Sequence, residues 1–195
     1  MKEALDVLAE VSALAERILT VTEIEKADSI SLMLVKKSTR KNGIQELGGI
    51  VGIRPKRPIF YAYHALNDLP YWTRDAVKYL CDYVDQLCKH WVYICTQKEK
   101  AMSGPMGKSL AIIKRSTGQK YSNLISNLEE YNKVFYVPAK HDFKLPEGRT
   151  EHRITSKEVV YTAFITMKIA QSIRDITKCN KEMECHRDDE VKHTV

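Results

Sequence analysis

The sequence predicts an all-α (mainly α) protein, an antiparallel helical bundle. Apolar residues recur at three- and four-residue steps along several long stretches, which is the period of one helix face. The 195 residues include only 8 Gly and 6 Pro, so few positions interrupt a helix. The length suits one sizeable core, and we expect a single helical domain over residues 1–178, followed by a charged, flexible tail over residues 179–195.

The N-terminal part contains one clear helix and one ambiguous segment. The first helix is expected from Lys2 to about Glu25, with an apolar face formed by Leu5, Leu8, Val11, Ala15, Ile18 and Leu19. Residues 29–35 fit a buried helix or a strand, and Asn42-Gly43 is typical of a hairpin turn, so a small β-hairpin near residues 30–53 stays open. We prefer a helix followed by a basic loop, because glycine and proline are frequent from Gly43 to Pro58.

The longest helix is expected from Thr73 to about Lys98, as the spine of the bundle. Its apolar stripe contains Val77, Leu80, Cys81, Val84, Leu87, Cys88, Trp91 and Cys95. The opposite face carries side chains that we expect to be solvated: Asp82, Asp85, Gln86 and Lys89. The chain has an odd number of cysteines, 5, and no C-x-x-C pair. We therefore expect no disulfides, no metal site and no cofactor, in a reducing compartment.

The sequence argues against a membrane-spanning or secreted protein and against a phosphate-binding loop. No apolar run approaches the roughly 20 residues that span a bilayer, and the N-terminus lacks the layout of a signal peptide, so we expect a soluble cytoplasmic protein with no membrane contact. Gly107-Lys108-Ser109 has the ending of a phosphate-binding loop, but Met102 stands where that motif needs its first glycine. We expect a turn there that opens the next helix.

Positive charge is concentrated in one region of the chain. The formal net charge is +6 at pH 7, and the segment from Lys36 to Arg57 alone carries the same excess, with Glu46 as its single acid. Its basic residues are Lys36, Lys37, Arg40, Lys41, Arg54, Lys56 and Arg57. Such a cluster suits a polyanion, for which nucleic acid is the commonest choice inside a cell, or forms a solvated surface.

Two helical patterns, Tyr121–Tyr136 and Thr155–Thr177, flank a short polar loop. Pro138 is expected to end the first helix. Thr155 and Glu158 form a capping box for the second, with Ile154 and Val159 spaced as a hydrophobic staple. These helices and Thr73–Lys98 should form the core, in which we expect Leu80, Val84, Leu128, Ala163 and Met167 to be buried.

The loop between these two helices collects residues that can cleave RNA without a metal. His141 and His152 offer two imidazoles, one to take the proton of a 2′-hydroxyl and one to protonate the leaving oxygen. Arg149, with Lys140 and Arg153 beside it, offers positive charge for the phosphorane. His141, His152 and Arg149 are the candidate catalytic residues; the alternative is a turn with solvated cations.

The helix layout around this loop resembles HEPN (higher eukaryotes and prokaryotes nucleotide-binding) domains. Asn132 and His141, within Y-N-K-V-F-Y-V-P-A-K-H-D-F, correspond to the asparagine and histidine of that family's motif, while Tyr131 stands where the family has arginine. The resemblance implies a small, often dimeric α-helical bundle. It also implies a metal-independent endoribonuclease of a defence or toxin–antitoxin system.

Three hypotheses about function follow, and the third is a small-molecule enzyme with a pocket between the helices, for which the sequence shows no nucleophile–base pair and no cofactor motif. The first is a HEPN-like RNA-binding protein, with or without ribonuclease activity. Its RNA-binding residues are Asn132, Lys140, Arg153, Lys36, Lys37, Arg40, Lys41, Arg54, Lys56 and Arg57. The second is a non-catalytic helical module that acts by homodimerisation or by binding a protein partner. Salt separates the first two, because phosphate contacts weaken steeply as salt rises and apolar contacts do not.

Overall fold

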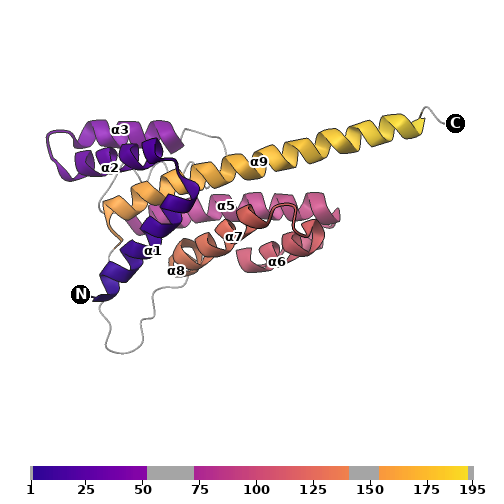
Figure 1. Ribbon diagram of the computed structural model, residues 1–195, viewed down its shortest axis with the longest axis horizontal. Coiled ribbons are helices and arrows are strands. Elements are labelled where there is room, and N and C mark those ends of the chain that lie inside the picture. The colour runs from indigo at the N-terminus through magenta and orange to yellow at the C-terminus, as the bar shows by residue number, and fades with distance from the viewer. Residues whose placement is uncertain (1, 52–72, 141–153, 193–195) are drawn as a thin grey trace.

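Every regular element in the part of the chain that the computed structural model describes is helical (Figure 1). The structure describes the backbone of residues 2–51, 73–140 and 154–192, and the side chains of residues 9–51, 73–140 and 154–178. The elements are α1 (Lys2–Ile18), α2 (Val21–Val35), α3 (Arg40–Val51), α5 (Thr73–Thr96), the short 3₁₀ helix η1 (Glu99–Met102), α6 (Met106–Thr117), α7 (Ser122–Tyr131), the π-helical turn η2 (Asn132–Tyr136), α8 (Val137–Lys140) and α9 (Ser156–Lys192). The predicted all-α class is confirmed. Within the described residues, none of the helices has the length and apolar character needed to cross a membrane.

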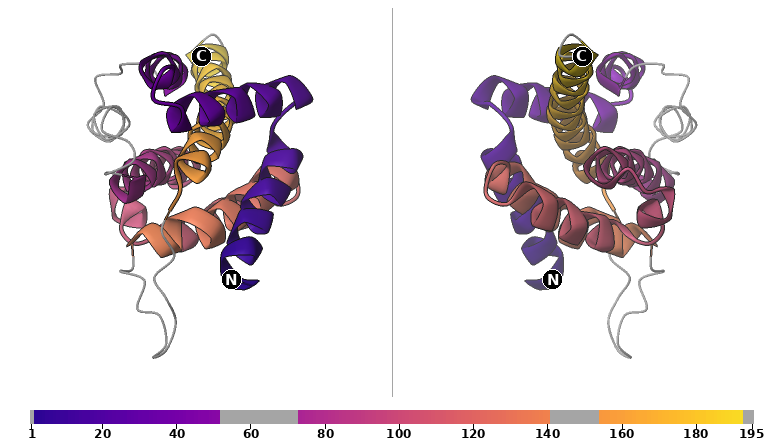
Figure 2. Two further views of the ribbon diagram at one scale, coloured as in Figure 1. Left: turned by 90° about the vertical axis from the view of Figure 1, so that its left-hand side faces the viewer. Right: turned by 90° about the vertical axis from the view of Figure 1, so that its right-hand side faces the viewer.

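Helices α5 and α9 pack side by side at the centre of the molecule, and α2 with α3 covers α9 from the other side (Figures 1 and 2). Leu80, Val84, Leu128 and Ala163 are fully buried, as predicted. Met167 is only partly buried, because it lies at the edge of a stripe on α9 whose centre is formed by other residues. Buried apolar side chains of α1, α2, α3 and α5–α9 belong to one continuous core.

The first predicted helix is wrong in its length. The chain turns at Leu19 and Thr20, and α2 begins with a capping box. The apolar stripe continues to Leu19 and gave no indication of this break. The Thr20 backbone N–H donates to Glu23 Oε2 at 2.7 Å, and the Glu23 N–H donates to Thr20 Oγ1 at 3.3 Å. These bonds satisfy orphan N–H groups at a helix start, which is why a new helix can begin here.

The alternative of a β-hairpin near residues 30–53 is wrong for the part that the structure describes, since residues 29–35 end α2, residues 36–39 form a turn and residues 40–51 form α3. The preferred helix is confirmed. The loop predicted from Gly43 is wrong as far as Val51, and its remainder lies outside the described residues. A Cβ at Gly43 would stand 2.9 Å from Met33 Cβ and 3.4 Å from the Ile30 carbonyl oxygen, so this glycine permits close packing of α3 on α2.

Pro138 does not end its helix, contrary to the prediction. The chain continues from α7 through η2 into α8, which ends at Lys140. The Val137 N–H donates to the Asn132 carbonyl, one residue further back than in an α-helix. This shift places Pro138 in the first turn of α8, where a missing N–H is tolerated.

The backbone after residue 178 stays helical to Lys192, where a flexible tail was predicted (Figure 1). That stretch is rich in helix-favouring charged residues and contains neither Gly nor Pro.

Candidate functional site

The three predicted catalytic residues, His141, Arg149 and His152, lie outside the residues that the structure describes. So do four of the predicted RNA-binding cations: Arg54, Lys56, Arg57 and Arg153. The structure does describe the residues on either side of 141–153. It also describes six of the predicted binding residues: Asn132, Lys140, Lys36, Lys37, Arg40 and Lys41.

The start of α9 has the capping box that the sequence predicts. The Thr155 N–H donates to Glu158 Oε2 at 2.6 Å, and the Thr155 hydroxyl donates to the same oxygen at 2.8 Å. The Glu158 N–H in turn donates to Thr155 Oγ1 at 3.3 Å. Val159 is fully buried and Ile154 partly buried against the core, as a hydrophobic staple requires. The start of α9 is therefore fixed against the core.

Lys140, the residue just before 141–153, already interacts with two side chains of the bundle. Its ammonium lies 2.8 Å from Asp82 Oδ1 on α5 and 5.3 Å from the centre of the Tyr136 ring. The hydrogen bond to Asp82 is the main reason that the pKa of Lys140 is raised above its ordinary value of 10.5. Since Asp82 offsets its charge, Lys140 adds less to a phosphate-binding surface than an unpaired lysine does.

Asn132 opens the π-turn and faces the first turn of α6. A Cβ on Gly107 would stand 3.9 Å from Asn132 Nδ2. The hydroxyl of Tyr136, at the end of the same turn, accepts a hydrogen bond from the Met106 backbone N–H, and burial raises the pKa of this phenol. Asn132 Oδ1 is buried without a hydrogen-bond partner among the described residues.

Asp85 was expected to be solvated, and this is wrong. Only 4% of it is exposed, because the π-turn and α8 pack against the face of α5 that carries it. Asp85 Oδ2 accepts a hydrogen bond from Lys89 Nζ at 2.7 Å, while Oδ1 has no partner within the described chain. The (i, i+4) spacing of Asp85 and Lys89 was the signal available in the sequence, and it is equally common on exposed helices.

The remaining predicted cations form one cluster, the basic turn, made of Lys36, Lys37, Arg40 and Lys41 between α2 and α3. Lys36, Lys37 and Lys41 are exposed and Arg40 is half-buried. None of the four forms an ion pair with a described residue, and the surrounding turn contains no acid. Their charges are therefore free to meet a polyanion.

Contacts between α2 and α9 show where the basic turn lies. Glu23 near the start of α2 pairs with Lys168 at 2.9 Å, while Asp28 further along α2 accepts a hydrogen bond from Tyr161 at 2.8 Å and pairs with Lys157 at 3.1 Å. The two helices are thus antiparallel, and the C-terminal end of α2 leads past the N-terminus of α9. The basic turn lies at the end of the molecule at which α9 begins, the end that faces the viewer in the left panel of Figure 2.

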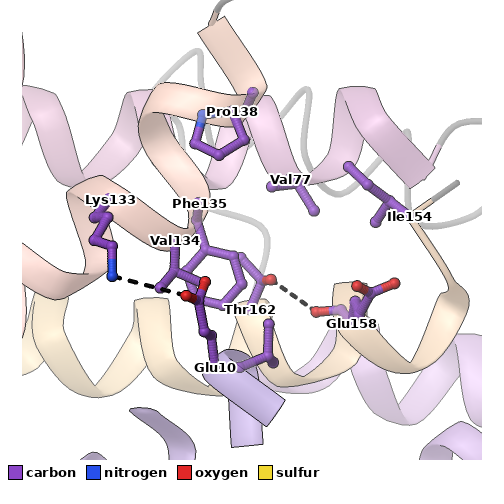
Figure 3. Close-up of a pocket in the computed structure, with 11 residues that line it drawn as sticks. Glu10, Val77, Lys133, Val134, Phe135, Pro138, Ile154, Glu158 and Thr162 are labelled. Atoms are coloured by element: carbon purple, nitrogen blue, oxygen red, sulfur yellow. Dashed lines mark hydrogen bonds and ion pairs between the residues drawn. The ribbon is translucent and has the colours of Figure 1, made fainter. Parts of the chain in front are cut away.

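A cavity of about 90 Å³ lies close to the same end, between α1, α5, the π-turn with α8, and the start of α9 (Figure 3). Pro138 and Ala139, which precede residues 141–153, form part of its wall, and Ile154 and Glu158, which follow them, form another part. The residues that precede and follow 141–153 in the sequence therefore line the same cavity.

Comparison of the chain with protein-family models, with curated proteins and with solved structures gave no match. No three of the His, Cys, Asp or Glu side chains in the described part of the chain converge as a metal site would require. The candidate site therefore rests on the basic turn, the two borders of the loop and the cavity.

Proposed function

We propose that this protein binds RNA through the basic turn, at the end of the bundle where α9 begins. The observation that carries the proposal is the cluster of four cations without an acidic partner among the described residues. RNA carries one negative charge per nucleotide, and each phosphate that a cation neutralises releases bound counterions.

The position of the basic turn supports the same proposal. Lys157, in the first turn of α9, is held by Asp28 of α2, so the N-terminus of a long helix lies next to α2 at this end. The residues proposed for catalysis precede this helix start in the sequence: His141, Arg149 and His152.

A test needs two variants with equal loss of charge. In the first, Lys36, Lys37, Arg40 and Lys41 are replaced by glutamine. In the control, four exposed cations next to η1, at the end of α6 and in the turn after it are replaced in the same way: Lys98, Lys100, Arg115 and Lys120. Binding of a labelled single-stranded RNA pool is then measured at several salt concentrations with EDTA present.

We expect the basic-turn variant to lose affinity and its plot of log affinity against log salt to flatten by up to about three units, since each contact with a single strand contributes about 0.7. The control should keep the wild-type slope. Equal slopes in both variants would show that only net charge matters and would contradict the site.

Cleavage is the finer part of the proposal, namely a HEPN-like, metal-independent ribonuclease of a defence or toxin–antitoxin type. The same incubations test it, because cleavage that survives EDTA and disappears in His141→Ala would assign the reaction to that imidazole. Intact RNA in all samples would limit the function to binding.

One observation favours a second candidate, a helical interaction module that binds a protein or a second copy. Leu32 and Val35, beside the basic turn, are 61% and 78% exposed. Exposed apolar side chains of this size are typical of contact surfaces when they adjoin one another. Association through them should change little with salt, whereas RNA binding should weaken steeply.

A further inference from the structure

The cavity at the start of α9 has apolar walls and polar groups at its edge. Val11, Val77, Val134, Phe135, Ala139 and Ile154 supply most of its lining. The π-turn contributes Val134 and Phe135 from adjacent positions, so this irregular turn helps to shape the space. Filling a space bounded by such side chains with another apolar group is favourable.

Hydrogen-bonding groups of both kinds stand at one side of the cavity. Figure 3 shows Glu10 and Lys133 on this side, opposite Ile154. The Lys133 ammonium lies 3.7 Å from Glu10 Oε1, a long ion pair, and the two side chains are 66% and 49% exposed. A ligand at the edge can therefore reach an acceptor and a donor without removing either charge from water.

We propose that this cavity binds one pyrimidine base of single-stranded RNA. The inference rests on the proposed function and names the part of the RNA that enters the protein. Single-stranded RNA is recognised by unstacked bases that enter apolar sites and form hydrogen bonds along their edges. Cytosine and uracil both present a donor and an acceptor, which suit Glu10 and Lys133.

The size of the cavity favours a single ring. A closed apolar cavity of about 150 Å³ holds benzene. This cavity is smaller, about 90 Å³, and opens to solvent, so one six-membered ring can enter with an edge left outside, whereas the two fused rings of a purine would leave more of their surface in water. The ribose and phosphates stay outside, at the end of the molecule that carries the basic turn.

The test uses nucleosides, which lack phosphate and so bypass the basic turn. Cytidine, uridine and adenosine are titrated separately into protein with labelled valine methyl groups, and the NMR signals of Val11, Val77 and Val134 are followed. We expect these signals to shift with cytidine or uridine at concentrations at least tenfold lower than with adenosine. No shift with either pyrimidine, or equal affinity for adenosine, would overturn the proposal.

Two variants place the binding in the cavity. Ala139→Leu fills it from the α8 wall and should abolish the shifts, while Ala111→Leu on the exposed surface of α6 is the matched control and should preserve them. The second variant replaces Glu10 and Lys133 by glutamine, leaves the walls intact and should weaken binding severalfold. Unchanged nucleoside affinity in a folded Ala139→Leu protein would contradict the site.

The outcome is separable from that of the proposed function. RNA binding that depends on the basic turn, with no nucleoside shift, would remove the base pocket and leave RNA binding in place. Nucleoside shifts without any RNA affinity would support the pocket and refute the basic turn as an RNA site.

Discussion

Two glycines on α3 have very different surroundings. A Cβ at Gly43 would stand 2.9 Å from Met33 Cβ and 3.3 Å from Leu34 Cδ2, whereas a Cβ at exposed Gly49 would meet nothing within 4 Å. Gly43→Ala should therefore push α3 away from α2 and cost about 1–3 kcal/mol. Gly49→Ala should stabilise the protein by up to about 1 kcal/mol, because alanine loses less backbone entropy in a helix.

Urea unfolding of the two variants beside the wild type measures both effects. Each variant adds one methyl group to the same helix, so differences in helix propensity cancel in the comparison. Equal stabilisation by both substitutions would contradict the close packing of α2 and α3.

The surroundings of single residues were the hardest feature to predict. Glycine frequency indicated a loop after Gly43, yet a glycine also serves where two helices approach closely, and the sequence does not show the partner helix. Asp85 lies opposite the apolar stripe of α5 and was expected to be solvated, but α8 packs there. In both cases the deciding neighbour comes from another element.

At the scale of elements, two capping boxes of the same sequence type begin α2 and α9. Glu158 is 4% exposed and its carboxylate receives the Thr155 hydroxyl at 2.8 Å. The corresponding Glu23 side chain is 32% exposed and receives the Thr20 hydroxyl at 3.0 Å. Thr155→Ala should cost about 1–2 kcal/mol and Thr20→Ala about 0.5–1 kcal/mol, since a buried carboxylate suffers more from losing a donor.

Thermal unfolding of both variants, each with a threonine-to-serine control that keeps the hydroxyl, checks this order. A larger loss at Thr20, or a loss in either serine control equal to that in alanine, would show that the buried hydrogen bond is not the cause.

The period of the apolar residues predicted the type of each element well, but it did not always predict where a helix ends. The apolar stripe of the first helix continued to Leu19, so the capping box at Thr20 was the better guide to its end. Pro138 was expected to stop a helix, and the π-turn that accommodates it has no signature in the apolar pattern. The start of α9 was predicted correctly because Thr155 and Glu158 form a local signal that depends on no distant contact.

At the scale of the whole molecule, the candidate site combines parts that are distant along the chain. The sequence identified the basic turn and the start of α9 separately. Their common position depends on the antiparallel pairing of α2 with α9, through Asp28 with Tyr161 and Lys157. The cavity depends on five elements at once, α1, α5, η2, α8 and α9, and had no signal in the sequence.

A second α2–α9 contact, between Glu23 and Lys168, should make stability depend on pH. Burial alone would raise the pKa of Glu23, but hydrogen bonds from the Thr20 backbone and from Lys168 outweigh burial and lower the pKa below 4.5. The contribution of this carboxylate is therefore fully present above that value and is lost as the pH falls through the lowered pKa. Since the side chain is 32% exposed, we expect Glu23→Gln to cost only about 0.5–1 kcal/mol at neutral pH.

Urea unfolding from about pH 7 down to about pH 3 follows this contribution through the range in which a carboxylate titrates. The stability of the wild type should approach that of Glu23→Gln as the pH falls, because protonated Glu23 no longer pairs with Lys168. The control, Glu129→Gln, removes the exposed carboxylate that lies 2.9 Å from Lys114 and should have a smaller effect at neutral pH. A difference between wild type and Glu23→Gln that stays constant with pH would show that the ion pair does not hold α2 on α9, and the basic turn would then lose one support for its position.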